Sequence, residues 1–179
     1  FGEKPARMTE GQPAREEAFM RRAISLLAVL LLVSLAVADD ARDPKAPRLT
    51  DEERKIFELT NEARKKEKLP PLKLNATLVK VARAHSANMA KQEKMAHELD
   101  GKNPTDRIKD AGYDPLSTGE NVGETEGGTA EEIFKMWMDS PPHKANILRE
   151  KVEEIGIGIA RSSKGVVYYT QVFATPRKR

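Results

Sequence analysis

Near the C-terminus, one strand has almost no side chains on one of its faces, and this feature constrains the fold most. In the segment EIGIGIA, isoleucines occupy every second position from 155 to 159, and the alternate positions are Gly156, Gly158 and Ala160. Strict alternation of this kind predicts a strand whose isoleucines share one face. A strand face without side chains lets another backbone come close, so we expect a packed element to cover the glycines.

The residues after this strand predict a hairpin. Residues 166–173 (VVYYTQVF) are β-branched or aromatic almost throughout, and residues 161–165 supply a turn. Upstream, apolar residues recur at helical spacing, with Leu78, Ala82 and His85 on one face of a helix. Helices followed by a terminal hairpin predict an α+β domain.

Capping residues mark where the expected helices begin. A Thr or Asn side chain at the N-cap satisfies a free backbone N–H, and a Glu three residues later completes a capping box. Prolines at 70–71 and 141–142 should end two helices, and residues 145–148 could add one turn. Residues 113–128 are rich in glycine and polar groups and predict no element. The expected caps are Thr50, Asn75, Thr105 and Thr129.

The segment 20–38 has the three parts of a secretory signal peptide. Two arginines precede an uncharged stretch, residues 23–38, that closes on the small residues Ala36 and Ala38. This apolar stretch is short for a membrane span, so we expect cleavage after Ala38. The alternative is an uncleaved signal-anchor, which would be the chain's one link to a membrane. Both interpretations place the remainder outside the cytoplasm.

The remaining boundaries follow from composition. We expect residues 1–19 to be a non-native extension upstream of a start at Met20, and residues 39–49 to be a flexible leader. The domain should cover residues 50–175. Residues 176–179 form a basic tail.

The absence of cysteine excludes several classes of site. Without thiols the chain has no disulfides, thiolate zinc site, iron–sulfur cluster or cysteine nucleophile. Its 31 basic and 28 acidic residues leave a net charge of +3, which does not indicate a nucleic-acid partner. An exported domain without disulfides depends on its hydrophobic core, a combination that favours a bacterial protein.

Three histidines and one glutamate are the candidates for chemistry. His85 lies on the apolar face of a helix, where it either bonds a neighbouring loop or serves a site. His97 lies in a loop, and His143 follows two prolines that fix its backbone. Glu120 stands beside a glycine in a segment that can bend and point it inward, or it is a solvated loop acid.

Two imidazoles and a carboxylate with one open position would suit zinc. The local spacing does not itself establish such a site, because HExxH, EF-hand, G-x-S-x-G and P-loop motifs do not occur. Ser140 precedes His143 by three residues, but Ser-Pro is a common sequence at the end of a helix and does not indicate a nucleophile.

The chain also contains a series of short motifs: LTNEAR (59–64), AHSANMA (84–90), AH (96–97), DRI (106–108), AGY (111–113), GENV (119–122), WMDSPPHKANIL (137–148), IGIG (155–158) and YYTQVF (168–173). Together these motifs resemble the CAP superfamily of cysteine-rich secretory proteins, antigen 5 and pathogenesis-related proteins, in its cysteine-free bacterial branch. The resemblance implies an α-β-α sandwich with a small antiparallel sheet between helical layers. It also implies a shallow cavity lined by His97 and Glu120.

This chain departs from the family pattern at two cavity positions. Tyr168 stands where animal and plant relatives have a second histidine, and Ser140 stands where they have a glutamate. Bacterial relatives carry the histidine matched here by His143, and we expect it to project into the same cavity. The resemblance thus implies binding residues His97, Glu120, His143, Tyr168 and Ser140. The tentative ligands for zinc or another divalent cation are His97, His143 and Glu120.

Three functions remain open at this stage. The first is an exported binding module of the envelope or extracellular space, which holds a small molecule, lipid or envelope component without turnover. The second is a metal-dependent extracellular hydrolase in which Glu120 is the general base, the one catalytic candidate. The third is a structural envelope protein tethered by its basic tail. Binding is favoured because the ligand set is incomplete and the motifs supply no dedicated nucleophile.

Overall fold

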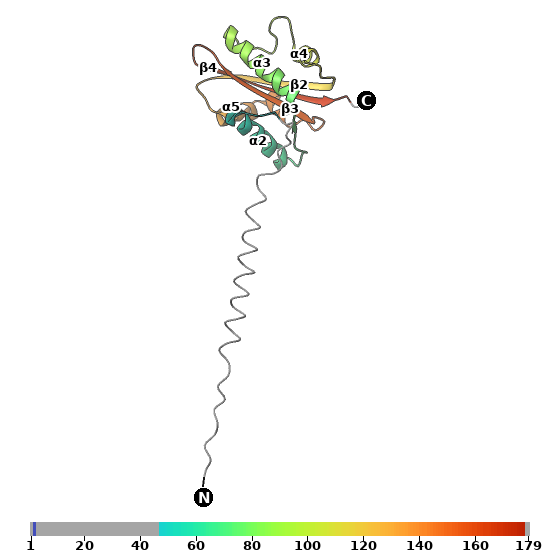
Figure 1. Ribbon diagram of the computed structural model, residues 1–179, viewed down its shortest axis with the longest axis vertical. Coiled ribbons are helices and arrows are strands. Elements are labelled where there is room, and N and C mark those ends of the chain that lie inside the picture. Colours follow the sequence, from blue (N-terminus) through green and yellow to red (C-terminus); the bar gives the residue numbers. More distant parts are fainter. Residues whose placement is uncertain (1, 3–46, 178–179) are drawn as a thin grey trace. The chain divides into compact units, whose positions relative to one another are not determined.

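The computed structural model describes residue 2 and residues 47–177 (Figure 1). The expected signal peptide, the extension before it and most of the leader lie outside the described residues. The described residues 47–177 lie within one compact unit. Among the residues described, none of the helices combines the length and the apolar character that a membrane crossing needs.

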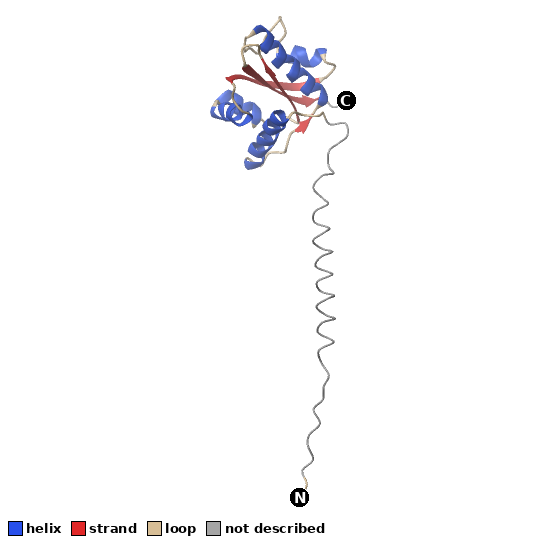
Figure 2. Ribbon diagram, turned by 60° about the vertical axis from the view of Figure 1, so that its left-hand side comes forward, coloured by secondary structure: helices blue, strands red, loops and turns tan. Residues whose placement is uncertain are grey.

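A four-stranded sheet, in the order β1-β3-β4-β2, lies between helices on both of its faces (Figure 2). Strands β2 and β3 both pair antiparallel with β4, while β1 pairs parallel with β3. The sheet is therefore mixed, and the expected antiparallel pairing holds for three of its strands. The elements are α2 (Asp51–Lys66), β1 (Lys73–Leu74), α3 (Ala76–Gln92), α4 (Pro104–Asp110), β2 (Pro115–Glu126), α5 (Ala130–Asp139), α6 (Pro141–Ile147), β3 (Glu154–Arg161) and β4 (Val166–Pro176).

Helix α3 packs directly on the bare glycine face of β3, as the alternation predicts. A Cβ atom built on Gly156 would lie 2.0 Å from the backbone carbon of Leu78, and one on Gly158 would lie 2.2 Å from that of Ala82. Ordinary carbon contacts are about 3.5–4.0 Å, so only glycine permits this approach. Ser86 of α3 also donates a hydrogen bond to the carbonyl of Gly158 at 2.9 Å.

The main hydrophobic core lies on the other face of the sheet, beneath α2, α5 and α6. The isoleucines of β3 point into it, which confirms the face predicted from their spacing. A smaller cluster on the α3 face includes Leu78, Ile108 and Val172. The fully buried members of the main core include Ile56, Ile133, Trp137, Ile147, Ile155, Ile157, Tyr169 and Phe173.

Three of the four expected helix caps are confirmed. Thr50 and Thr129 form capping boxes, and the Asn75 side chain accepts hydrogen bonds from two backbone N–H groups. The cap of α4 is Asn103 and not Thr105, because Pro104 already takes the first helical position. Prolines also begin α6, so this helix starts at residue 141, before the single turn expected at 145–148.

The sequence does not predict strand β2, because its residues 115–126 lack apolar alternation. It lies at the edge of the sheet, and side chains from other elements bond its outer carbonyls, a role that a neighbouring strand would otherwise have. These bonds are Arg149 to Thr118 at 2.9 Å, Asn146 to Glu120 at 3.1 Å and Trp137 to Val122 at 3.0 Å. Polar and glycine residues can therefore form this strand.

The helical layers are also joined by an ion pair. Arg83 of α3 donates two hydrogen bonds to the buried Glu53 of α2, at 2.8 and 2.6 Å, and a third to the carbonyl of Arg48 at 2.8 Å. The bonds to Glu53 raise the pKa of Arg83. This pair ties the start of the domain to the helix on the opposite face.

Candidate functional site

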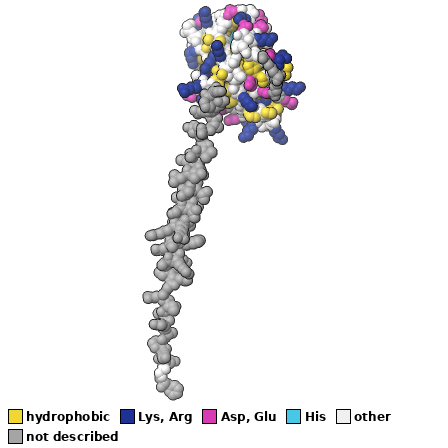
Figure 3. Space-filling view, turned by 45° about the vertical axis from the view of Figure 1, so that its right-hand side comes forward, with side chains coloured by type: hydrophobic (Ala, Val, Ile, Leu, Met, Phe, Trp, Pro, Cys, Tyr) yellow, Lys and Arg dark blue, Asp and Glu magenta, His cyan; other side chains and the backbone are white. Residues whose placement is uncertain are grey.

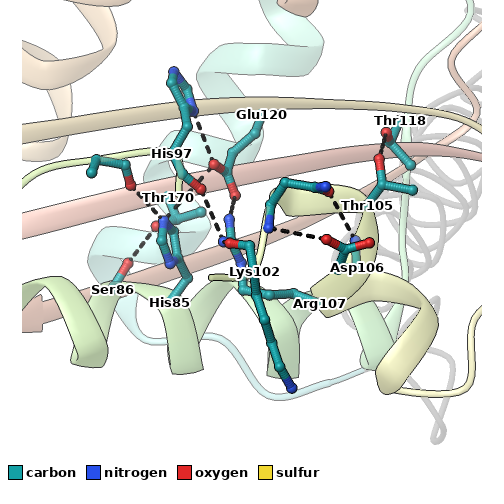
Figure 4. Close-up of polar contacts among 12 residues, drawn as sticks. His85, Ser86, His97, Lys102, Thr105, Asp106, Arg107, Thr118, Glu120 and Thr170 are labelled. Atoms are coloured by element: carbon teal, nitrogen blue, oxygen red, sulfur yellow. Dashed lines mark hydrogen bonds and ion pairs between the residues drawn. The ribbon is translucent and has the colours of Figure 1, made fainter. Parts of the chain in front are cut away.

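Glu120 is a buried carboxylate with both oxygens bound (Figure 4). It lies on β2 and points toward α3 and α4, with 1% of its side chain exposed. One oxygen lies 3.0 Å from Nδ1 of His97, and the other accepts a hydrogen bond from Nη2 of Arg107 at 2.6 Å. The alternative of a solvated loop acid is therefore wrong.

His97 lies in the loop between α3 and α4, and the side chains of Arg107 and His85 hold that loop. Arg107 of α4 donates from Nη1 to the carbonyls of His97 and Lys102, at 2.9 and 2.8 Å. The ring of His85 on α3 lies 2.9 Å from the carbonyl of Ala96 through Nε2. Burial lowers the pKa of His85, partly offset by the negative charge of Glu120. His85 thus bonds a neighbouring loop, one of its two expected roles.

His143 belongs to the helical layer on the face of the sheet opposite α3. It lies on α6, and its carbonyl accepts a hydrogen bond from the Asn121 side chain at 3.1 Å. Burial lowers the pKa of His143, and the charge of His97 lowers it further. Ser140 occupies the N-cap position of α6.

Tyr168 is packed among apolar side chains. It is 2% exposed, and burial raises its pKa. Its position on β4 places it beneath the loop that carries His97. Its cluster contains Met89, Ala90, Leu99 and Val122.

These residues do not form a ready metal site. Within residue 2 and residues 47–177, no group of three or more His, Asp or Glu side chains is arranged to hold a metal ion. Glu120 is already bound to His97 and to a guanidinium, whose positive charge would oppose a cation beside that carboxylate. A zinc site built from His97, His143 and Glu120 stays a prediction, and it would require Glu120 to give up a partner.

The same geometry bears on the hydrolase interpretation. A general base must reach the proton that it removes, either directly or through one water. Glu120 is buried and neither of its oxygens is free, whereas 53% of the His97 side chain is exposed. Of the two, His97 is the group placed to meet a molecule arriving from solvent.

Two grooves on the described part of the chain lie elsewhere. The larger, of about 470 Å³, has Lys73, Leu116 and Glu150 in its wall, and the smaller, of about 290 Å³, lies beside Thr50 and Arg161. Neither wall includes His97, Glu120 or His143. A cavity lined by these three residues stays a prediction.

The importance of Arg107 was not recognised from the sequence. Its segment, Asp106-Arg107-Ile108, contributed to the family resemblance, but nothing in the spacing connects an arginine on α4 with a glutamate on β2. The available signal was indirect, since a carboxylate that is buried requires a cation nearby.

The structure is an α-β-α sandwich in which a histidine contacts a buried glutamate, as the CAP resemblance implies. The family model that matches residues 57–173 is CAP, the cysteine-rich secretory protein family. The chain therefore belongs to this family, as its motifs predict.

The similar proteins include several from bacteria. The uncharacterized protein YkwD of Bacillus subtilis (strain 168) is 37% identical over 122 residues, which are 68% of this chain and 46% of that protein. The chain spans less than half of the curated relatives it matches. An outer surface protein of Borrelia burgdorferi is 26% identical with a TM-score of 0.65, over 73% of this chain and 97% of that one. An extracellular protein containing an SCP domain, from Bacillus anthracis, is 25% identical with a TM-score of 0.64, over 74% and 45%.

Proposed function

We propose that this chain is an exported CAP-domain protein of the cell envelope or extracellular space that binds a ligand without turning it over. Export is supported by the signal-like segment 20–38 and by similarity to an outer surface protein and an extracellular SCP-domain protein. The ligand is a small molecule, a lipid or an envelope component. Basic and acidic side chains are interspersed over the visible face of the domain (Figure 3). This mixture of charges does not indicate a nucleic-acid partner.

The observation that carries the binding role is the exposed His97 ring, which is held in place by the ion pair of Arg107 and Glu120. Arg107 and Glu120 offset each other's charge, and both Arg107 and His85 bond the loop on which His97 stands. Such support fixes a side chain before a ligand arrives, which lowers the entropic cost of binding. We include His143 as the second imidazole of the proposed binding site.

Export is tested by expressing the full chain in a bacterial host and sequencing the N-terminus of the protein found outside the cytoplasm. An N-terminus at Asp39 would support the proposal, because cleavage should follow Ala38. Retention of the whole chain in the cytoplasm would contradict it.

Binding is tested on the exported protein by native mass spectrometry and lipid extraction of material purified without detergent. We expect a bound molecule that is lost from His97→Ala and His143→Ala and kept by Glu98→Ala, an exposed change in the same loop. Equal occupancy in all four proteins would place the ligand elsewhere. Protein that carries no molecule after exposure to envelope extract would contradict binding.

The hydrolase and structural-tether alternatives lack a supporting observation of this kind. In the described part of the basic tail, Arg177 bonds Asp114 through its side chain at 3.3 Å and its backbone N–H at 3.0 Å. A residue held in this way is less available to anionic lipid or polymer.

A further inference from the structure

Arg107 connects three parts of the site through one guanidinium group. Nη2 donates to Glu120 at 2.6 Å, while Nη1 donates to the carbonyls of His97 and Lys102. Only 12% of the Arg107 side chain is exposed. Since a guanidinium is a planar, permanently charged donor, it fixes the direction of every group that accepts from it.

The carboxylate of Glu120 passes this constraint on to His97. An ionised carboxylate only accepts hydrogen bonds, and Arg107 only donates them. With one oxygen bound to Arg107, the other faces Nδ1 of His97 at 3.0 Å, so Nδ1 must carry the hydrogen. In the neutral ring, Nε2 then carries the lone pair. Figure 4 shows that second nitrogen pointing away from Glu120.

We propose that Arg107 is a positioning residue that acts through Glu120 to hold His97 in the Nδ1–H form and to present Nε2 to the ligand. Glu120 orients the ring and does not touch the ligand. The part of this inference that concerns a ligand rests on the proposed binding function, whereas the tautomer of His97 does not.

The geometry also defines the chemical class of the ligand. Arg107 is bound by Glu120, so it is not available to an anion, and Glu120 is bound on both oxygens, so it is not available to a cation. In the neutral form of the ring, the exposed Nε2 of His97 is a hydrogen-bond acceptor. This acceptor matches a ligand that offers a hydroxyl or amide hydrogen, and we expect that class of ligand at Nε2 of His97.

The substitution Glu120→Gln gives the sharpest test because it reverses the proton positions. Arg107 only donates, so the new amide must turn its oxygen toward Arg107 and its NH2 group toward His97. Nδ1 of His97 must then accept, and the ring should change to the Nε2–H form. A residue that merely stabilised the fold would not invert a tautomer.

The measurement is long-range 1H–15N NMR of histidine-labelled full-length protein at a pH of about 8.5, where most imidazoles are neutral. We expect Nδ1–H in the wild type and in Glu98→Gln, the matched control in the same loop. Glu120→Gln should show Nε2–H. The double variant Arg107→Met with Glu120→Gln frees the amide to rotate, so Nδ1–H should return in part.

The outcomes separate cleanly. The inference is overturned by Nε2–H in the wild type, by Nδ1–H in Glu120→Gln, or by a double variant with the same tautomer as that single variant. If Glu120→Gln does not fold, the inference is still overturned by Nε2–H in the wild type or by a double variant that shows only Nε2–H. No ligand is used, so a failure here is distinguishable from a failure of the proposed binding function.

Discussion

Replacing Gly156 with alanine tests the close approach of α3 to β3. The new Cβ atom would lie 2.0 Å from the carbonyl carbon of Leu78, 2.3 Å from its oxygen and 2.3 Å from the nitrogen of Val79. All three atoms are helix backbone, so α3 would have to retreat by about 1.5 Å to reach an ordinary contact of about 3.5 Å. Overpacking typically costs about 1–3 kcal/mol, and a helix backbone that must move as a unit places this variant at the upper end or above it.

Thermal unfolding of Gly156→Ala should therefore show a melting temperature lower by roughly 10 °C. Gly123→Ala is the matched control, since its Cβ would lie 2.4 Å from Cδ1 of Ile133, the end of a side chain that can rotate away. We expect the control to lose about 1 kcal/mol. Equal losses in the two variants would refute the reasoning that backbone contact with α3 is what requires the glycine.

Three further predictions concern stability. Trp137→Phe removes the donor to the outer carbonyl of Val122, and urea unfolding should show a loss of about 1–3 kcal/mol with an unchanged slope. Glu53→Gln weakens the pair with Arg83, which is 41% exposed, so the expected loss is only about 1 kcal/mol and should shrink in high salt. Burial lowers the pKa of His85 in the folded state, so the unfolded chain binds the proton more readily below about pH 6.5. The free energy of unfolding should fall as the pH drops through that value, and less steeply in His85→Asn.

Local patterns were sufficient for most elements of the fold. Alternating isoleucines and glycines predicted β3 and a packed element on its bare face, and capping residues such as Thr50 and Asn75 predicted where helices begin. These signals are readable because each depends on residues that are neighbours along the chain. The family motifs added the layered arrangement, which periodicity alone did not supply.

Strand β2 and the parallel pairing of β1 could not be predicted in this way. The outer carbonyls of β2 bond side chains from α5, from α6 and from Arg149, none of which its own sequence specifies. Strand β1 has two residues, Lys73 and Leu74, too few to show any alternation. Both strands exist because distant elements supply their hydrogen-bond partners.

Some properties of the candidate site follow from the sequence, and others depend on the tertiary structure. The sequence by itself determined that His97 and Glu120 stand in a loop and in a Gly-Glu-Asn segment similar to those of CAP proteins, and that the chain has no thiol chemistry. Only the tertiary structure decided that Glu120 is buried against Arg107 and that His97 is the exposed member. The physical reason is that a buried charge requires a compensating partner, and the packing of α4 against β2 selects which residue that is.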